Sequence, residues 1–241
     1  MVARLRAERL ARARKPFLAR GGSRRPRCGG CRLVESHCIC ALRRSLATRA
    51  GVCLLMHDAE PLKPSNTGWL VADVVTDTFA FGWARTEVAP ALLVLLADPR
   101  WQPVLVFPAQ YAPAARVWQA LPPAELPGAP DAPRPLLVLL DGTWSEARKM
   151  FHHSPYLAAL PVLDLAGVDS AYPLRRSTQA GHLCTAEVVA QCLALAGDER
   201  AAALLQAWLR LYIERYVRAR EQRPVLPGSA AEAALVQAGR E

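Results

Sequence analysis

The apolar run Leu136-Leu-Val-Leu-Leu140 is followed directly by Asp141 and Gly142, and it constrains the fold more than any other stretch of the chain. A continuous apolar run of this length is typical of a buried strand in a parallel sheet covered on both faces. After the turn, Thr143 and Glu146 have the spacing of a capping box that opens a helix. Ligands bind outside the carboxyl ends of such strands, so Asp141 is expected to point its carboxylate into a pocket. A role in the turn or cap is the alternative.

Further apolar runs alternate with helical patterns along the chain, and this alternation predicts an α/β fold. The other expected strands are residues 52–56, 92–96 and 104–107, with 160–165 as a further candidate. The expected helices are residues 66–82, 113–120, 144–153, 186–196 and 201–220. Residues 121–135 hold six prolines and should form a surface connection, because proline fits neither a helix interior nor a central strand.

The positive charge is concentrated at the N-terminal end. Residues 1–27 hold ten Lys and Arg against Glu8 alone, a net charge of +9 that equals the formal charge of the whole chain. Such an arm gains free energy along phosphates by releasing counterions. A disordered solubilising tail and an Arg-rich presequence are the alternatives. There is no apolar run of the roughly 18 residues that a membrane span needs, and no secretory signal, so we expect a cytoplasmic protein without a membrane partner.

Four of the seven cysteines follow the spacing Cys28-x2-Cys31-x6-Cys38-x-Cys40. Four thiolates that converge on one ion suit a closed structural zinc site. An iron–sulfur cluster uses the same number of ligands, and disulfides would require an oxidising compartment. His37 lies inside the cluster and could replace one cysteine. The remaining cysteines, expected to be ordinary buried residues, are Cys53, Cys184 and Cys192.

Asp141-Gly142-Thr143-Trp144 matches the Asp-x-Thr-Trp signature of the DTW-domain family. Other family-like stretches cover about residues 27–198 in the expected order: the Cys28 to Cys40 head, Glu60-Pro-Leu-Lys-Pro-Ser-Asn-Thr-Gly68, Trp83-Ala-Arg-Thr86, Val106-Phe-Pro-Ala109, Leu174-Arg175 and Cys184-Thr-Ala-Glu-Val188. The chain therefore resembles the tRNA-uridine aminocarboxypropyltransferases of this family. Trp69 is a departure, because related sequences often carry a basic residue there.

The resemblance implies a SPOUT-like, mainly parallel sheet with helices on both faces and a knot. The expected divisions are a basic, flexible arm (1–26), a four-cysteine zinc-binding segment (27–48), a catalytic domain that binds S-adenosylmethionine (49–223) and a weakly packed C-terminal tail with one short helical stretch (224–241). The oligomeric state stays open, with a monomer favoured.

The resemblance also implies transfer of the 3-amino-3-carboxypropyl group of S-adenosylmethionine to N3 of a tRNA uridine, in the variable loop, with release of methylthioadenosine. Asp141 is the expected base, because N3 is a weakly acidic imide. Trp144 offers a flat surface for the uracil or the adenine, and helix packing is its alternative role. An RNA methyltransferase and a non-catalytic, zinc-containing RNA-binding module remain competing interpretations.

The cofactor pocket is expected to be formed by Phe107, Pro108, Asp141, Thr143, Leu174, Thr185 and Glu187. The residues expected to bind the carboxylate of the cofactor or the tRNA phosphates are Lys63, Asn66, Arg85 and Arg175. Exposed charged residues without a ligand are the alternative for this second group. For Glu187, the alternative to binding the ammonium of the cofactor is a helix cap. His57, His152 and His153 show no ligand spacing and are expected to be ordinary residues.

Overall fold

The computed structural model describes residues 1–14, 25–122, 132–165 and 183–240. It contains a six-stranded sheet in the order β2-β1-β5-β3-β6-β4, in which every neighbouring pair is parallel. The strands are β1 (Gly51–Met56), β2 (Thr78–Gly82), β3 (Trp101–Val106), β4 (Val117–Trp118), β5 (Arg134–Asp141) and β6 (Val162–Leu163). The expected α/β fold with a mainly parallel sheet is confirmed.

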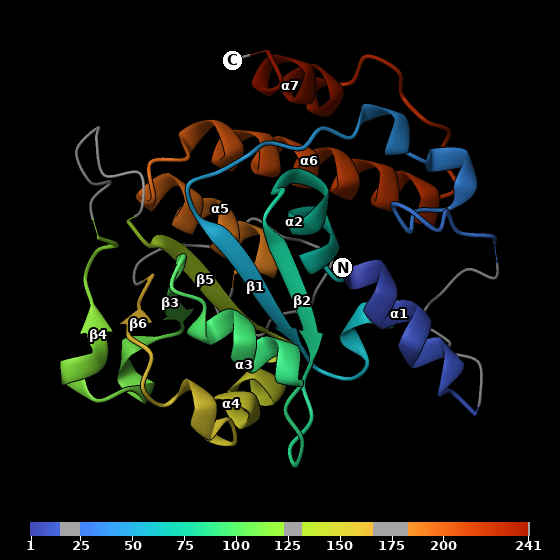
Figure 1. Ribbon diagram of the computed structural model, residues 1–241. Coiled ribbons are helices and arrows are strands. Elements are labelled where there is room, and N and C mark those ends of the chain that lie inside the picture. Colours follow the sequence, from blue (N-terminus) through green and yellow to red (C-terminus); the bar gives the residue numbers. More distant parts are fainter. Residues whose placement is uncertain (15–24, 123–131, 166–182, 241) are drawn as a thin grey trace.

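Alternating side chains of the central strands enter two separate cores. In β1, Val52, Leu54 and Met56 join one core, and Cys53 and Leu55 join the other. The first core is closed by α2 (Gly68–Val74), α5 (Thr185–Leu195) and α6 (Glu199–Arg220), and the second by α3 (Pro90–Ala97) and α4 (Trp144–His152), as Figure 1 shows. Because helices cover both faces, the strands need continuous apolar runs, as the sequence indicated.

Three segments differ from the expected secondary structure. Residues 92–96 lie in α3 and do not form a strand: Pro90 stands in the first helical turn, and Leu92 and Leu95 are buried while Leu93 and Val94 are exposed. The helix expected over 66–82 ends at Val74, and β2 follows it. Residues 113–120 form a 3₁₀ turn, Ala114–Arg116, and then the short strand β4.

The N-terminal end is not flexible over its first residues. Residues Val2–Ala11 form helix α1, which buries Val2 and Leu5 against the domain and contacts β2 and the 3₁₀ turn Glu60–Leu62. Arg9 Nε also lies 2.8 Å from Asp58. The expectation of a flexible arm is therefore wrong for these residues, because apolar residues three apart share one helix face. Residues 15–24 lie outside the described part of the chain.

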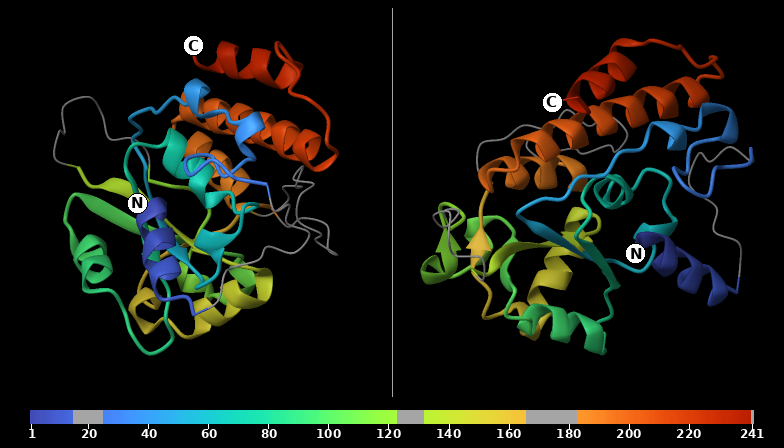
Figure 2. Two further views of the ribbon diagram at one scale, coloured as in Figure 1. Left: turned by 90° about the vertical axis from the view of Figure 1, so that its right-hand side faces the viewer. Right: turned by 45° about the horizontal axis from the view of Figure 1, so that its top comes forward.

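The C-terminal segment also packs more firmly than expected. Helix α7 (Ala230–Ala238) lies on the outer side of α6 (Figure 2), with Leu235 and Ala238 buried. Glu232 Oε2 accepts a hydrogen bond of 2.7 Å from Arg215, a nearly buried residue of α6. This ion pair of the nearly buried Arg215 with the half-buried Glu232, together with the apolar contact, holds the segment against α6.

Two further expectations depend on the undescribed segments. The path of residues 166–182, on which a knot depends, lies outside the described residues, as do positions 123–131 of the proline-rich connection. None of the helices that the structure describes is long and apolar enough to cross a membrane.

Candidate functional site

The candidate site lies at the carboxyl edge of the sheet. Strands β1 and β5 end side by side there, because Met56 is in register with Asp141. The backbone N–H of His57, just after β1, donates a hydrogen bond of 2.9 Å to the carbonyl oxygen of Asp141. The helix start at Thr185 reaches the same edge. Three segments that are far apart in the sequence thus meet where ligands bind to parallel sheets.

Asp141 is nearly fully buried, and both of its carboxylate oxygens accept hydrogen bonds. Asn66 Nδ2 donates to Oδ2 at 2.7 Å, and Thr185 Oγ1 donates to Oδ1 at 2.6 Å. The sequence predicted all three residues as site residues, and the structure brings them together. Hydrogen bonds from neutral donors stabilise the ionised carboxylate in a buried position.

Glu60 is a member of this group that the sequence analysis missed. It is fully buried and accepts hydrogen bonds from Asn66 Nδ2 at 2.9 Å and from Lys63 Nζ at 2.7 Å. The amide of Asn66 therefore donates to two buried carboxylates, and Lys63 supplies a positive charge beside one of them. The position of Glu60 in the Glu60 to Gly68 stretch, close to two family-like polar residues, was the sequence feature that could have identified it.

Gly68 begins α2 directly beside this group. Its backbone N–H donates to Asn66 Oδ1 at 3.0 Å. A Cβ at this position would lie 3.0 Å from Asp141 Oδ2 and 3.2 Å from Asn66 Oδ1. The close approach of the backbone to Asp141 thus favours glycine at this position, because a larger residue would push its neighbours aside.

Trp144, on the first turn of α4, packs in an aromatic group. Its ring stacks on Phe107 with centroids 5.5 Å apart, and Phe107 stacks on Phe151 at 4.6 Å. Tyr111 contacts both Phe107 and Trp144 edge to face. Trp144 remains half-buried, while Phe107 is 6% exposed. Phe107 therefore serves the second core and supports Trp144 from within it, with Pro108 next to Phe107 in the loop after β3.

The capping box expected at the start of α4 is present. Thr143 Oγ1 accepts from the backbone N–H of Glu146, and Glu146 Oε2 accepts from the backbone N–H of Thr143 at 2.7 Å. Burial alone would raise the pKa of Glu146, but the hydrogen bonds from Thr143 and the nearby His57 lower it below its usual value. His57 Nδ1 lies 3.1 Å from Glu146 Oε1, within ion-pair distance. The box fixes the turn that carries Asp141.

The other predicted site residues are divided between this group and the surface. Glu187 Oε2 accepts from the backbone N–H of Cys184 at 2.8 Å, so it acts as a helix cap. Arg85 is exposed on the loop after β2, and within the described part of the chain it makes no hydrogen bond with the Asp141 group. Leu174 and Arg175 lie outside the described residues.

The four cysteines Cys28, Cys31, Cys38 and Cys40 converge, and their sulfur atoms all lie within 4.8 Å of one another. The Sγ separations are 3.6 Å for Cys28 and Cys40, 3.8 Å for Cys31 and Cys38, and 3.5 Å for Cys28 and Cys38. Zn–S bonds of about 2.3 Å in a tetrahedron place the sulfur atoms about 3.8 Å apart. An iron–sulfur cluster spreads its thiolates further, because several iron atoms lie between them. The cluster fits a single tetrahedral ion.

The surroundings of the cysteines favour a charged thiolate at one position. Backbone hydrogen bonds from Cys31, and more weakly from Gly30, lower the pKa of Cys28 to about 7, although burial opposes them. Burial, and after it the neighbouring cysteines, raises the pKa of Cys31 and of Cys40. A bound cation would allow thiolates this close to be charged together. His37 does not join the cluster, because its Nε2 lies 2.9 Å from the carbonyl oxygen of Arg223 on the segment after α6.

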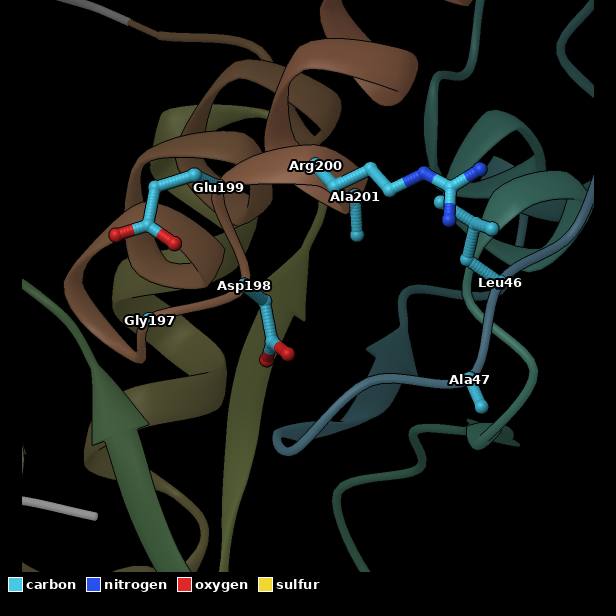
Figure 3. Close-up of a pocket in the computed structure, with 7 residues that line it drawn as sticks. All are labelled: Leu46, Ala47, Gly197, Asp198, Glu199, Arg200 and Ala201. Carbon is cyan, nitrogen blue, oxygen red and sulfur yellow. The ribbon is translucent and has the colours of Figure 1, made fainter. Parts of the chain in front are cut away.

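A surface hollow lies at the end of α5 that is opposite Asp141 (Figure 3). Leu46 and Ala47 line one side of it, and the turn that joins α5 to α6 lines the other. One of its two carboxylates, Asp198, accepts hydrogen bonds from the backbone N–H groups of Arg49 at 2.7 Å and Ala50 at 2.9 Å. Asp198 thus fixes the approach to β1. These contacts give the hollow a structural role, and the carboxyl edge of the sheet is the candidate site.

Comparison with known proteins places most of the chain in one domain family. The model of the DTW domain matches residues 25–217. The chain is also 43% identical over 60 residues to tRNA-uridine aminocarboxypropyltransferase 2 of Drosophila melanogaster, a match that spans 24% of this chain and 24% of that relative. No solved structure matches the chain significantly. Since the domain model covers well over half of the sequence, including the four cysteines, Asn66, Asp141 and Thr185, the chain belongs to the DTW-domain family.

Proposed function

We propose that the protein transfers the 3-amino-3-carboxypropyl group of S-adenosylmethionine to N3 of a uridine in tRNA and releases methylthioadenosine. The observation that carries the proposal is the DTW domain together with the local match to a relative named for this activity. The buried group of Asn66, Asp141 and Thr185 at the carboxyl edge of the sheet supports it, because it supplies polar chemistry where parallel α/β proteins bind ligands.

The proposed reaction needs positioning and one proton acceptor. The N3 atom of the uracil attacks the γ-carbon of the aminocarboxypropyl group, the bond from that carbon to sulfur breaks, and its electron pair leaves with methylthioadenosine. The N3 proton passes to Asp141. Asn66 and Thr185 hold the carboxylate in one orientation, from which it would accept a proton from an imide brought within hydrogen-bond reach.

The protein also has to select which carbon beside the sulfonium is attacked, and it does so by orienting the cofactor. We propose that the loop at Phe107 and Pro108, the capped turn at Thr143 and the start of α5 at Thr185 and Glu187 form the cofactor pocket. Trp144 would present its half-buried ring to the uracil or the adenine, supported from behind by Phe107.

The basic N-terminal segment is proposed to bind tRNA phosphates. Helix α1 lies beside the turn Glu60–Leu62, close to the candidate site, and the ion pair of Arg9 with Asp58 holds it there. Arg12 and Arg14, which follow the C-terminal end of α1, are exposed to solvent. Phosphate contacts of this kind position a protein on RNA and carry no base information directly. Lys63, Arg85 and Arg175 are proposed as additional contacts.

We propose zinc for the four-cysteine cluster. The sulfur separations suit one tetrahedral ion, and four thiolates without an open position are typical of a structural zinc site. Zinc would fold a segment that is too short to have a core of its own. Free thiols in this arrangement fit a reducing compartment, so we propose the cytoplasm.

The test is product analysis after incubation of the purified protein with tRNA and S-adenosylmethionine. Mass spectrometry of the digested tRNA should show aminocarboxypropyl uridine, and the small-molecule fraction should contain methylthioadenosine. Production of S-adenosylhomocysteine with methylated RNA would replace the proposal with a methyltransferase. Binding of tRNA without binding or use of S-adenosylmethionine would leave a non-catalytic RNA-binding module.

A further inference from the structure

Arg32 connects the cysteine cluster to the candidate site. It directly follows Cys31 and is only 4% exposed. Its Nη1 donates a hydrogen bond of 2.7 Å to the carbonyl oxygen of Asn66, 34 residues further along the chain. Asn66 in turn donates to Asp141. A short series of contacts therefore leads from one cysteine of the cluster to the carboxylate of the site.

The fold of the cysteine segment sets the position of Arg32. Its backbone N–H donates to the carbonyl oxygen of Cys28 at 2.9 Å, and the N–H of Cys28 donates to the carbonyl oxygen of Leu33 at 2.8 Å. Arg32 has φ of 64°, a left-handed conformation that residues other than glycine rarely adopt. The turn that brings Cys28 and Cys31 together is thus the same turn that aims the Arg32 side chain.

Two aromatic rings contact the guanidinium of Arg32. It lies 4.4 Å from the centroid of the Trp69 ring and 5.6 Å from that of Tyr212 on α6. The Tyr212 hydroxyl donates to the carbonyl oxygen of Pro64. Two carbonyl oxygens of the loop from Pro64 to Asn66 therefore accept side-chain hydrogen bonds, one from α6 and one from the cysteine segment. Trp69, the departure from the family pattern, acts here as the surface on which Arg32 rests.

We propose that Arg32 is a positioning residue, which transmits metal binding at the four cysteines to the alignment of Asn66 with Asp141. Loss of the ion would unfold the turn of Cys28 to Leu33 and withdraw Arg32 from the Asn66 carbonyl. The Asn66 amide would then lose its fixed orientation toward Asp141. The inference deepens the proposed function, on which its catalytic consequence rests, by making the metal a condition for an aligned site.

The backbone amide of Gly68 reports on this alignment without any catalytic assay, since it donates to Asn66 Oδ1. We suggest measuring its hydrogen exchange in the metal-loaded protein, in the metal-stripped protein and in Arg32→Met. Metal removal should speed exchange at Gly68 by roughly two- to tenfold, the effect expected when one hydrogen bond between neutral groups is removed. Metal-loaded Arg32→Met should show a similar increase, and stripping its metal should add nothing further.

Arg44→Met is the matched control, because Arg44 belongs to the same segment but is exposed. It should respond to metal removal as the unaltered protein does. Should Arg32→Met fail to fold, Arg32→Gln provides the same comparison, since it keeps a polar group at the buried position but lacks the charge and the reach of the guanidinium. The proposal is overturned if metal removal does not change the hydrogen-exchange rate of Gly68. It is also overturned if metal removal raises that rate equally in the unaltered protein and in Arg32→Met.

Activity separates this inference from the proposed function. Metal-loaded Arg32→Met should have a reduced kcat for transfer with an unchanged affinity for tRNA, whereas a loss of tRNA affinity alone would contradict a positioning role. If the unaltered protein shows no transfer at all, the proposed function fails, and the exchange of Gly68 still decides whether metal and site are coupled.

Discussion

Asn66 and Asp141, 75 residues apart in the sequence, are joined by a hydrogen bond of 2.7 Å from Nδ2 to Oδ2. The same nitrogen donates to Glu60 at 2.9 Å, so one side-chain amide bridges two buried carboxylates. An amide has two N–H donors, and this arrangement uses both. Without the bridge, the two acids would face each other in a medium that disfavours like charges. Asn66 is therefore central to the electrostatics of the site.

The first prediction concerns Asp141→Asn. The new amide can keep both hydrogen bonds, because its oxygen can face Asn66 and the Thr185 hydroxyl can turn to accept from its nitrogen. The variant should fold and bind S-adenosylmethionine, but transfer should slow by roughly 10²–10⁴-fold, the usual contribution of acid–base catalysis. Single-turnover rates at saturating cofactor, measured against pH, provide the comparison.

Thr185→Val is a useful companion, since it removes one donor to Asp141 and leaves the carboxylate in place. It should slow transfer less than Asp141→Asn does. A well-folded Asp141→Asn protein with a near-normal rate would show that Asp141 only orients the substrates. Failure to bind the cofactor or lowered thermal stability would assign it a structural role.

The second prediction is that Gly68→Ala damages the site. The added methyl group would lie 3.0 Å from Asp141 Oδ2, closer than carbon and oxygen normally approach. Overpacking of this kind destabilises proteins by about 1–3 kcal/mol. Gly82→Ala is the control, because a Cβ there meets nothing within 4 Å. Urea denaturation of both variants should show a lower midpoint for Gly68→Ala, and equal midpoints would argue against the close contact.

The third prediction is that Gly30→Ala lowers the metal content. Its Cβ would lie 2.7 Å from Cys40 Sγ, inside the space where the sulfur atoms converge, whereas a Cβ at Gly29 meets nothing within 4 Å. Metal analysis should find one zinc per chain in the unaltered protein and in Gly29→Ala, and less in Gly30→Ala. Acid should release the metal, because thiolate ligands become protonated as pH falls. An iron–sulfur chromophore in the purified protein would refute the assignment of zinc.

The fourth prediction is that the exposed arginines of the N-terminal segment determine part of the salt dependence of tRNA binding. Deleting the segment would also remove Val2 and Leu5 from the core, so neutralising Arg12 and Arg14 to Gln is the cleaner change. The slope of log affinity against log salt should fall by roughly 0.7–0.9 for each phosphate that these arginines no longer neutralise. Arg200→Gln, at the hollow away from the site, should leave the slope unchanged. An unaltered slope in the double variant would leave α1 with a packing role only.

The sequence predicted best what local rules determine. The strand, turn and capped helix around Asp141 were recognisable because a buried apolar run and a capping box are both short-range patterns. Residues 92–96 show the limit of such patterns, since five apolar residues fit a strand as well as a helix. Pro90 at the start of the helix and the three-residue spacing of Leu92 and Leu95 favoured α3, and contact with the core decided it.

The connections within the site could not be predicted from local patterns. Asn66 and Thr185 reach Asp141 only because the sheet order places β1 next to β5 and brings the start of α5 to the same edge. Glu60 was overlooked because charged residues in loops are usually exposed, and its burial depends on two partners that the fold supplies. The helical form of α1 was missed because its charge outweighed the two apolar residues that anchor it.

The strand order also has a consequence for synthesis on the ribosome. Strand β1 pairs with β2 soon after both are made, but its other neighbour, β5, begins about 80 residues after β1 ends. At a translation rate of about 5–20 residues per second, one edge of β1 waits roughly 4–16 seconds for its partner. Thr185 then emerges later still. The nascent chain therefore carries an apolar strand edge for much of its elongation. A ribosome stalled before Thr185 holds a protein in which the carboxylate of Asp141 has yet to receive the hydrogen bond from the Thr185 hydroxyl.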